Sequence, residues 1–108
     1  MARIAVKRGV QPPLIHILTA LATVAGVTTS PKTIVITSGI EGTHSPTSFH
    51  YRLAAIDVRS RNFPTPYDKA MFATRMRAAL GDDYEVLLLK KGTRGEHFHI
   101  EEDRKRTR

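Results

Sequence analysis

The sequence contains no cysteine and no tryptophan, and aromatic residues make up only 6% of its 108 residues. The absence of cysteine excludes a disulfide framework and any thiolate metal site. If the chain binds a metal, its own ligands must therefore be histidine, aspartate or glutamate. The scarcity of aromatic side chains also leaves no base-stacking platform, so the sequence does not indicate a specific nucleic-acid binder.

Long hydrophobic runs are absent as well. The most apolar stretch, residues 14–27, is interrupted by one histidine and two threonines and follows two prolines. It is shorter than the ~20 apolar residues that cross a bilayer, so we expect no membrane span. Basic residues before this stretch imitate the start of a signal peptide, but its polar interruptions favour a mature chain without an export signal.

The charge is strongly basic, with a formal net charge of +7. Such a balance attracts polyanions, including nucleic acids, acidic lipids and the anionic polymers of a bacterial envelope. Much of the charge lies in a basic arm, residues 1–11, and in a basic tail, residues 102–108. Terminal charge runs are usually solvated, so charge alone indicates little about function.

Length and hydrophobicity predict one small folded domain that covers residues 1–108. Apolar periodicity predicts helices at about residues 14–25 and 66–80, and β-branched or alternating segments predict strands at about 33–37, 53–58, 84–89 and 96–100. A further short extended piece is expected at residues 3–6. The fold class is α+β, a small antiparallel sheet with two helices packed on it.

The second helix has the clearest end signals. Thr65 is a good N-cap, Pro66 suits the first helical position, and Asp68 completes a capping box. Gly81 is expected to end the helix. The predicted buried positions of the first helix are Leu14, Ile17, Leu18, Leu21, Ala22 and Ala25, and those of the second are Phe72, Met76, Ala79 and Leu80.

Two stretches, residues 48–59 and 96–101, contain three of the five histidines and three acids, Asp57, Glu96 and Glu101. Neutral imidazoles and a carboxylate are ligands that zinc takes, and a catalytic zinc site needs three of them plus water. Our hypothesis is that His50, Asp57 and His99 hold one zinc ion. The alternative is that these are ordinary strand or loop histidines and a surface acid. Because His50 and Asp57 are seven residues apart, His50 must precede the strand in a bend.

The second stretch also offers proton-transfer groups. On a strand, His97 and His99 share one face and Phe98 lies on the opposite, core-facing side. A zinc-bound water needs a nearby general base, for which Glu96 is the first candidate and His97 the second. Glu101 shares the nominal face of His99 and is a candidate hydrogen-bond partner for its ring.

The pattern Ser48-x-His50-x-x-Leu53-x-Ala55-x-Asp57 resembles the S-x-H-x-x-G-x-A-x-D motif of the D-alanyl-D-alanine zinc peptidases. That superfamily also includes the hedgehog signalling domains and many phage cell-wall hydrolases. The resemblance implies a hedgehog-like α+β fold over about residues 12–101.

A second motif, Glu96-x-x-His99, resembles the E-x-x-H motif of the same peptidases and follows the first at a fitting separation. The resemblance implies that His50, Asp57 and His99 are the zinc ligands and that Glu96 is the catalytic base. It also implies that Ser48 contacts the substrate.

His97 matches the first position of an H-x-H pair of related members, where that histidine stabilises the transition state. Two positions depart from the family pattern. Leu53 replaces its glycine, and Ile40 stands where an arginine that binds the substrate carboxylate is frequent. Arg52 or Arg59 is the candidate replacement for that arginine, and the sequence does not decide between them.

The expected function is a zinc (Zn2+) metallopeptidase that hydrolyses peptide bonds of bacterial peptidoglycan, as an endopeptidase or a carboxypeptidase. The resemblance implies a phage endolysin or virion-associated hydrolase, present in the host cytoplasm before lysis or in the virion. Two alternatives remain: a catalytically inactive zinc-binding module of a cell wall or virion, and a nucleic-acid binder on charge alone.

Overall fold

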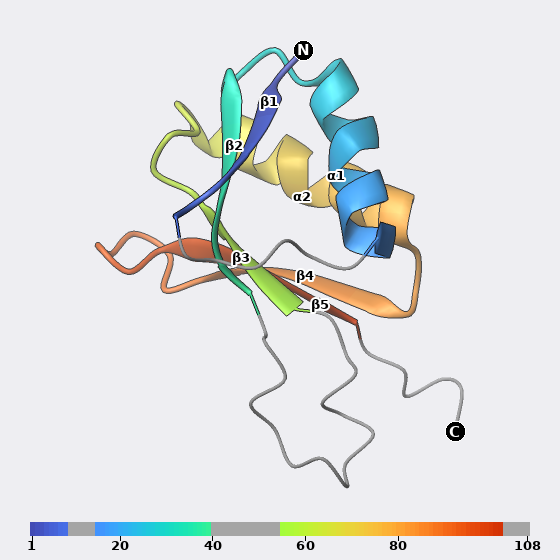
Figure 1. Cartoon of the computed structure of the whole chain (residues 1–108). Coiled ribbons are helices and arrows are strands. Elements are labelled where there is room, and N and C mark those ends of the chain that lie inside the picture. Colours follow the sequence, from blue (N-terminus) through green and yellow to red (C-terminus); the bar gives the residue numbers. More distant parts are fainter. Residues whose placement is uncertain (9–14, 40–54, 103–108) are drawn as a thin grey trace, which may run out of the picture.

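The computed structural model describes residues 1–8, 15–39 and 55–102. In chain order its elements are β1 (Arg3–Val6), α1 (Ile15–Val27), β2 (Thr33–Gly39), β3 (Ala55–Arg59), α2 (Pro66–Leu80), β4 (Tyr84–Leu89) and β5 (His97–Glu102) (Figure 1). The domain is therefore α+β, as predicted, with two helices and a five-stranded sheet among the described residues.

The strands are ordered β1-β2-β3-β5-β4 across the sheet. β1 pairs with β2 in parallel, whereas the other neighbours are antiparallel. The prediction of a purely antiparallel sheet is thus wrong for one pair. The physical reason is the connection through α1: a helical crossover lets the chain return and add a second strand in the same direction.

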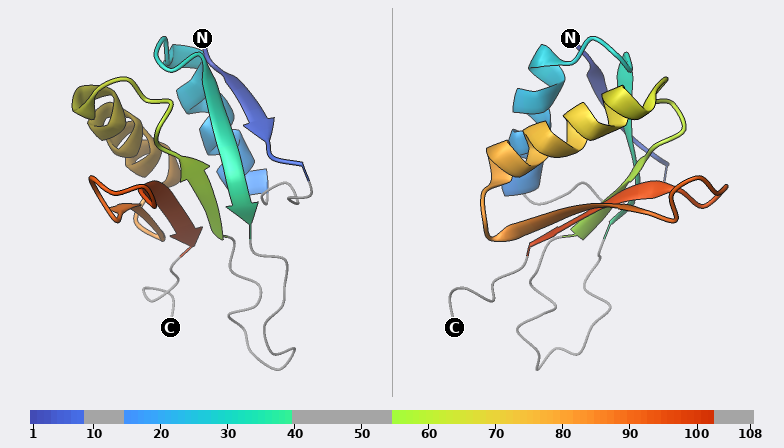
Figure 2. Two further views of the ribbon diagram at one scale, coloured as in Figure 1. Left: turned by 90° about the vertical axis from the view of Figure 1, so that its left-hand side faces the viewer. Right: turned by 180° about the vertical axis from the view of Figure 1, so that it is seen from behind.

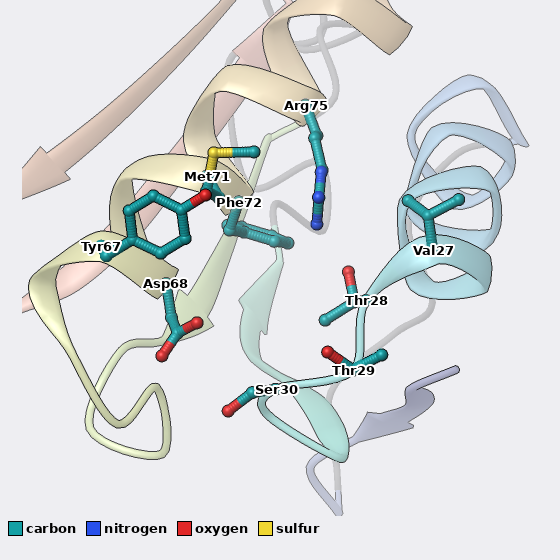
Figure 3. A pocket seen from close by; sticks show the side chains of 9 residues that line it. All are labelled: Val27, Thr28, Thr29, Ser30, Tyr67, Asp68, Met71, Phe72 and Arg75. Carbon is teal, nitrogen blue, oxygen red and sulfur yellow. The ribbon is translucent and has the colours of Figure 1, made fainter.

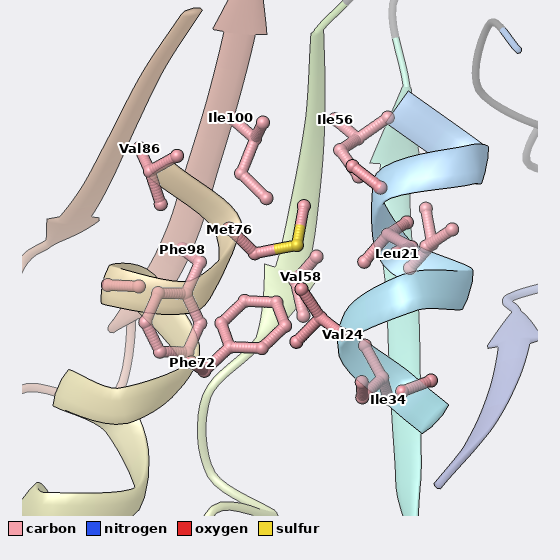
Figure 4. Close-up of a cluster of buried hydrophobic side chains, with 14 of the residues drawn as sticks. Leu21, Val24, Ile34, Ile56, Val58, Phe72, Met76, Val86, Phe98 and Ile100 are labelled. Carbon is pink, nitrogen blue, oxygen red and sulfur yellow. The ribbon is translucent and has the colours of Figure 1, made fainter. Parts of the chain in front are cut away.

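Both helices lie on one face of the sheet, as the two views of Figure 2 show. Their buried side chains meet those of the sheet in one core, which includes Leu21 and Val24 of α1, Phe72 and Met76 of α2, and Val58 of β3 (Figure 4). The opposite face, which we call the open face, carries the side chains that alternate with this core.

An aromatic cluster anchors α2 to the sheet. The rings of Phe63, Phe72 and Phe98 lie with centroids 4.8–5.1 Å apart in tilted or edge-on arrangements. Each of the three side chains is almost completely buried. Such ring pairs add about 0.5–1.5 kcal/mol beyond burial alone, so the cluster fixes the position of β5 relative to α2.

The predicted N-cap and C-terminal end of α2 are confirmed. The Thr65 hydroxyl accepts a hydrogen bond from the backbone N–H of Asp68 at 3.1 Å, and Gly81 follows the helix with φ 86°. The Asp68 carboxylate accepts from the Thr65 hydroxyl, whereas a capping box would have it accept from the Thr65 backbone N–H. The predicted buried face was partly wrong, because Ala73 is buried whereas Ala79 is exposed. The buried face predicted for α1 was also partly wrong. Ala22 was predicted to be buried but is exposed, whereas Ala20 and Val24 were not predicted and are buried.

β4 has its predicted bounds, and β5 begins one residue later than predicted and extends to Glu102. Phe98 and Ile100 are fully buried against the helices, while His97, His99 and Glu101 are half-buried on the open face. The predicted alternation in β5 is therefore confirmed. Among the described residues no helix combines the length and the apolarity that crossing a membrane requires.

Candidate functional site

The open face is organised as three cross-strand rows over the neighbouring strands β4, β5 and β3. The rows are Leu89–His97–Arg59, Leu87–His99–Asp57 and Glu85–Glu101–Ala55. Cβ atoms of directly opposite residues on antiparallel strands lie about 4.5–5.5 Å apart. The register therefore places residues of β3 and β5 that are 38 to 46 positions apart in the sequence at contact distance.

The central row brings together two of the predicted metal ligands. The Asp57 Oδ1 and His99 Nδ1 atoms are 2.9 Å apart, and the His99 Nε2 atom lies 2.8 Å from Glu101 Oε1. The side chains of Asp57 and His99 are 28% and 26% exposed, so they are partly shielded but reachable from solvent. Glu101 occupies the place beside the imidazole that the sequence indicated.

Both ring nitrogens of His99 thus face a carboxylate oxygen, which can only accept a hydrogen bond when ionised. Burial by itself lowers the pKa of His99, but the hydrogen bonds with Asp57 and Glu101, together with their charges, raise this pKa overall. If Nε2 donates to Glu101 and the ring is neutral, Nδ1 and Asp57 Oδ1 are two acceptors in contact. A proton or a metal ion between them satisfies both atoms.

The donor set fits zinc in this respect. Two ligand atoms at about 2.0–2.1 Å from a tetrahedral zinc lie about 3.3 Å from each other, close to the 2.9 Å separation of Asp57 Oδ1 and His99 Nδ1. No group of three or more His, Asp or Glu residues arranged to hold a metal occurs within residues 1–8, 15–39 and 55–102. A complete site thus requires a third ligand from elsewhere in the chain, for which the sequence indicates His50.

Ser48, His50 and Arg52 lie outside the described residues. Their place in the chain is nevertheless informative, because residues 40–54 connect the end of β2 to the start of β3. β2 ends at Gly39, which pairs with Ile56, the neighbour of Asp57. The connection therefore starts and ends close to the central row.

His97 lies on the same face, next to the central row. Its Nε2 atom is 3.9 Å from Asp57 Oδ1, and its Nδ1 atom is 2.7 Å from the carbonyl oxygen of Gly95. A carbonyl only accepts, so Nδ1 carries the hydrogen and a neutral His97 has its free lone pair on Nε2. That nitrogen is available as a proton acceptor beside Asp57.

Glu96 occupies a different environment. Its Oε1 atom accepts hydrogen bonds from Lys69 Nζ of α2 at 2.6 Å and from the Ser60 hydroxyl at 2.8 Å. Its Oε2 atom accepts from the backbone N–H of Gly92 at 3.1 Å. These hydrogen bonds, above all that from Lys69, lower the pKa of Glu96 to about 2.

The structure therefore does not bring Glu96 to the Asp57–His99 pair. The reason is strand parity: Glu96 is an odd number of residues from His99, so its side chain turns toward α2. Sequence reasoning missed Lys69 and Ser60, which hold this carboxylate. The only local signal for Ser60 is a small hydroxyl directly after a strand, which is common in proteins and predicts no partner.

A pocket lies on the helix side of the sheet, between the end of α1 and the start of α2 (Figure 3). Its volume is about 100 Å³, and it contains none of the predicted site residues. The Thr28 hydroxyl in its wall donates to the carbonyl of Val24 at 2.6 Å, and the Asp68 carboxylate accepts from the Thr65 hydroxyl at 2.7 Å. These groups serve the helix ends, so the open face remains the stronger candidate site.

No protein-family model matches the chain, and neither the comparison with curated proteins nor that with solved structures found a match. The two sequence motifs and the geometry of the open face are therefore the observations that bear on function. Of the eight predicted site residues, the open face of the described structure holds Asp57, Arg59, His97 and His99.

Proposed function

We propose that the protein is a zinc-dependent peptidase that hydrolyses peptide bonds of bacterial peptidoglycan, with His50, Asp57 and His99 as zinc ligands. The contact between Asp57 and His99 carries the proposal, because these residues are 42 positions apart and were paired from motif spacing alone. Glu101 adds a carboxylate on the other ring nitrogen of His99, an arrangement that commonly orients metal-binding histidines.

Bound zinc would polarise the scissile carbonyl and lower the pKa of the attacking water. The chain must then supply a group that accepts the proton from the water and returns it to the leaving amine. We assign this role to His97, because its Nδ1 is used by the carbonyl of Gly95 and its Nε2 lies on the open face near Asp57. The resemblance indicated Glu96 instead, but a carboxylate with a pKa of about 2 is a weak base at neutral pH.

Asp57 has a second task in this assignment. Its Oδ1 atom lies between the two histidines, 2.9 Å from His99 Nδ1 and 3.9 Å from His97 Nε2. When His97 accepts a proton it becomes a cation, and the nearby negative charge stabilises that cation. Asp57 is thus both a candidate ligand and an electrostatic partner for the base.

Two measurements test the proposal. Elemental mass spectrometry of protein purified without an affinity tag should find about one zinc per chain, and His99→Ala should lose it. Digestion of purified peptidoglycan, followed by mass spectrometry of released peptides, should detect products with the wild type. A wild-type protein that neither contains zinc nor takes it up when supplied would refute the assignment.

A pair of neighbouring variants separates the two candidate bases. His97→Gln should retain zinc and lose most hydrolysis, since a general base typically contributes 10²–10⁴-fold. Glu96→Gln should retain much of the activity once measured at a temperature where the variant is folded. The reverse result would return the role of base to Glu96.

One observation favours a second candidate, an inactive zinc-binding module of a cell wall or virion. The acid of the E-x-x-H motif is held away from the metal pair by Lys69, so the family base is not in place. Zinc binding together with cosedimentation on peptidoglycan, without released peptides, would support this candidate. Under either proposal the source is a phage or prophage, and the protein acts in the host cytoplasm before lysis or in the virion.

A further inference from the structure

Strand β4 lies at one edge of the sheet and has a free side. It stands last in the order β1-β2-β3-β5-β4, so within the described part of the chain its only neighbouring strand is β5. Two of its side chains, Leu87 and Leu89, are 40% and 36% exposed. An apolar edge strand with unpaired backbone groups readily pairs with a further strand, and proteins usually protect such edges. The edge of β4 is therefore a candidate interaction surface.

The direction of the backbone groups on this edge follows from β5. The hydroxyl of Ser60, directly after β3, donates to the carbonyl of Glu96 at 3.0 Å, so this carbonyl points toward β3. In antiparallel strands, alternate residues turn their N–H and C=O groups to opposite neighbours. His99 therefore bonds with β4, where its partner is Leu87. The two residues that flank Leu87 consequently direct their backbone groups outward.

These outward groups belong to Val86 and Leu88. The Val86 carbonyl accepts a hydrogen bond from the guanidinium of Arg77 at 2.7 Å, in agreement with its outward direction. A carbonyl oxygen has two lone pairs, so Val86 can accept a second hydrogen bond from a further strand. Two residues of the edge thus offer donors and acceptors to a partner.

The charges along this edge are arranged so that two copies complement each other. Acids stand at the start of β4 and lysines directly follow its end: Asp82, Asp83 and Glu85, then Lys90 and Lys91. Asp83 borders a groove against both helices, and Lys91 borders another against α2, so both lie on the helix side. Within the described residues neither forms an ion pair. Two antiparallel copies of β4 bring the acidic end of each to the basic end of the other.

We propose that the edge of β4 pairs with the same edge of a second copy of this chain, antiparallel and about a two-fold axis at Leu87. Asp83 and Lys91 are each four residues from Leu87, so this register places Asp83 opposite the partner's Lys91. It also places Val86 opposite the partner's Leu88, and both residues direct their backbone groups outward, as a hydrogen-bonded pair requires. A two-fold interface uses one self-complementary surface twice.

The pairing joins two five-stranded sheets into one continuous sheet. Leu87 is the partner of His99, which is in turn the partner of Asp57, so the central row continues across the axis into the partner's central row. The two His99 residues are then separated by three strand spacings, about 14 Å. The inference goes beyond the proposed function, and neither zinc binding nor hydrolysis decides it.

Sedimentation velocity of the wild-type protein tests whether this dimer forms. A contact of one six-residue strand per copy is at the low end of interface sizes, below about 1,200 Å². We therefore expect a dimer that dissociates on dilution, with the monomer giving way to the dimer between about 1 μM and 1 mM protein. A wild type that remains monomeric over this range would overturn the proposal, whichever other partner covers the edge.

Two charge reversals and their mixture test the register. Asp83→Lys and Lys91→Glu each place like charges opposite one another at both ends of the interface. Each variant alone should dimerise about tenfold more weakly than the wild type, because two attractive pairs become repulsive. An equal mixture of the two variants should form heterodimers with close to wild-type affinity, since every contact then joins opposite charges. A mixture that associates no better than its components would exclude this register.

Lys7→Glu is the matched control for Lys91→Glu. Lys7 directly follows β1, at the opposite edge of the sheet, so its reversal should not weaken the dimer. Both variants reduce the net charge of +7, which by itself favours association. A weaker dimer with Lys91→Glu alone would therefore identify a local contact, whereas equal weakening by both variants would overturn the proposal.

Leu87→Lys tests the axis independently of these charges. The substitution is on an exposed position and places two ammonium groups opposite each other at the axis. The variant should be folded by circular dichroism and should remain monomeric wherever the wild type dimerises. Dimerisation equal to that of the wild type would show that β4 does not form the interface.

Discussion

The three hydrogen bonds to Glu96 should make the stability of the domain dependent on pH in the acid range. Glu96 receives them from Lys69, Ser60 and Gly92, and they lower its pKa from 4.5 to about 2. Each unit of pKa difference corresponds to about 1.4 kcal/mol, so full coupling would amount to about 3 kcal/mol. The side chains of Glu96 and Lys69 are 10% and 23% exposed, and solvent screening reduces our expectation to about 1–2 kcal/mol.

The sign follows from the direction of the pKa change. A carboxyl group whose pKa is lower in the folded protein stabilises the fold above its unfolded pKa, and this stabilisation is lost as the pH falls through the folded pKa. Glu96 should therefore contribute fully above pH 4.5, and its contribution should disappear between pH 4.5 and about 2. Near neutral pH this stabilisation is fully present, so Glu96 does not make the stability depend on pH there.

Urea denaturation of the wild type and of Glu96→Gln, followed by circular dichroism at several pH values, measures the effect. At pH 7 the variant should be less stable by about 1–2 kcal/mol, which for a domain of this size lowers the Tm by about 4–16 °C. Near pH 2 the two proteins should have equal stability. Glu85→Gln is the control, because Glu85 faces Glu101 across the strands; its removal should be neutral or slightly stabilising at pH 7. A Glu96→Gln difference that persists unchanged at pH 2, or is missing at pH 7, would refute the reasoning.

Two further substitutions test how the scaffold of the site is held. Thr65→Ala should cost about 1 kcal/mol because it removes the N-cap acceptor of α2; thermal unfolding should detect the loss, while Thr65→Ser should recover most of it. Phe98→Ala should lower the free energy of unfolding by about 3–5 kcal/mol because it empties the centre of the aromatic cluster. Leu89→Ala, on the open face of the adjacent strand, should lower it much less in the same denaturation series. Equal losses would contradict the assignment of Phe98 to the core.

The sequence predicted those elements whose signals are local. The ends of α2 followed from Thr65, Pro66 and Gly81, because a cap acts within four residues of itself. β4 followed from its composition and from the turn after it. The alternation in β5 was also readable, since a period of two needs only the strand itself.

The errors concern contacts between distant segments. The parallel pairing of β1 with β2 depends on where α1 packs, which no residue of β1 encodes. Likewise, the buried face of α2 contains Ala73 where the prediction had Ala79, because the angle at which the helix meets the sheet decides which alanine is covered. The spacing of apolar residues indicates a face only to within about one helical position, and small alanine side chains fit on either side of its border.

The sequence indicated that Asp57 and His99 lie together, and the structure places them in contact because the sheet register aligns the two motif positions. Their role as metal ligands stays a prediction. The assignment of Glu96 used the same motif and required a distorted strand or a turn, because an offset of three residues from His99 places its side chain on the opposite face. In the structure Lys69, Ser60 and Gly92 hold the carboxylate on that opposite side. A sequence motif does not specify the face of the sheet on which each side chain lies, whereas successive residues of a strand point to opposite faces.

The position of Glu96 also bears on the proposed chemistry, because moving its carboxylate to the Asp57–His99 pair would have an energetic cost. A bulge at the start of β5 could turn its carboxylate to the open face, but Lys69, Ser60 and Gly92 would then lose their acceptor. Hydrogen bonds to charged groups contribute about 1.5–3 kcal/mol each, and Lys69 would be left half-buried without its partner. His97 needs no such rearrangement, since its Nε2 atom already lies on the open face beside Asp57. For Glu96 to act as the base, substrate binding would have to provide several kcal/mol that His97 does not require, and this difference is the reason for assigning the proton transfer to His97.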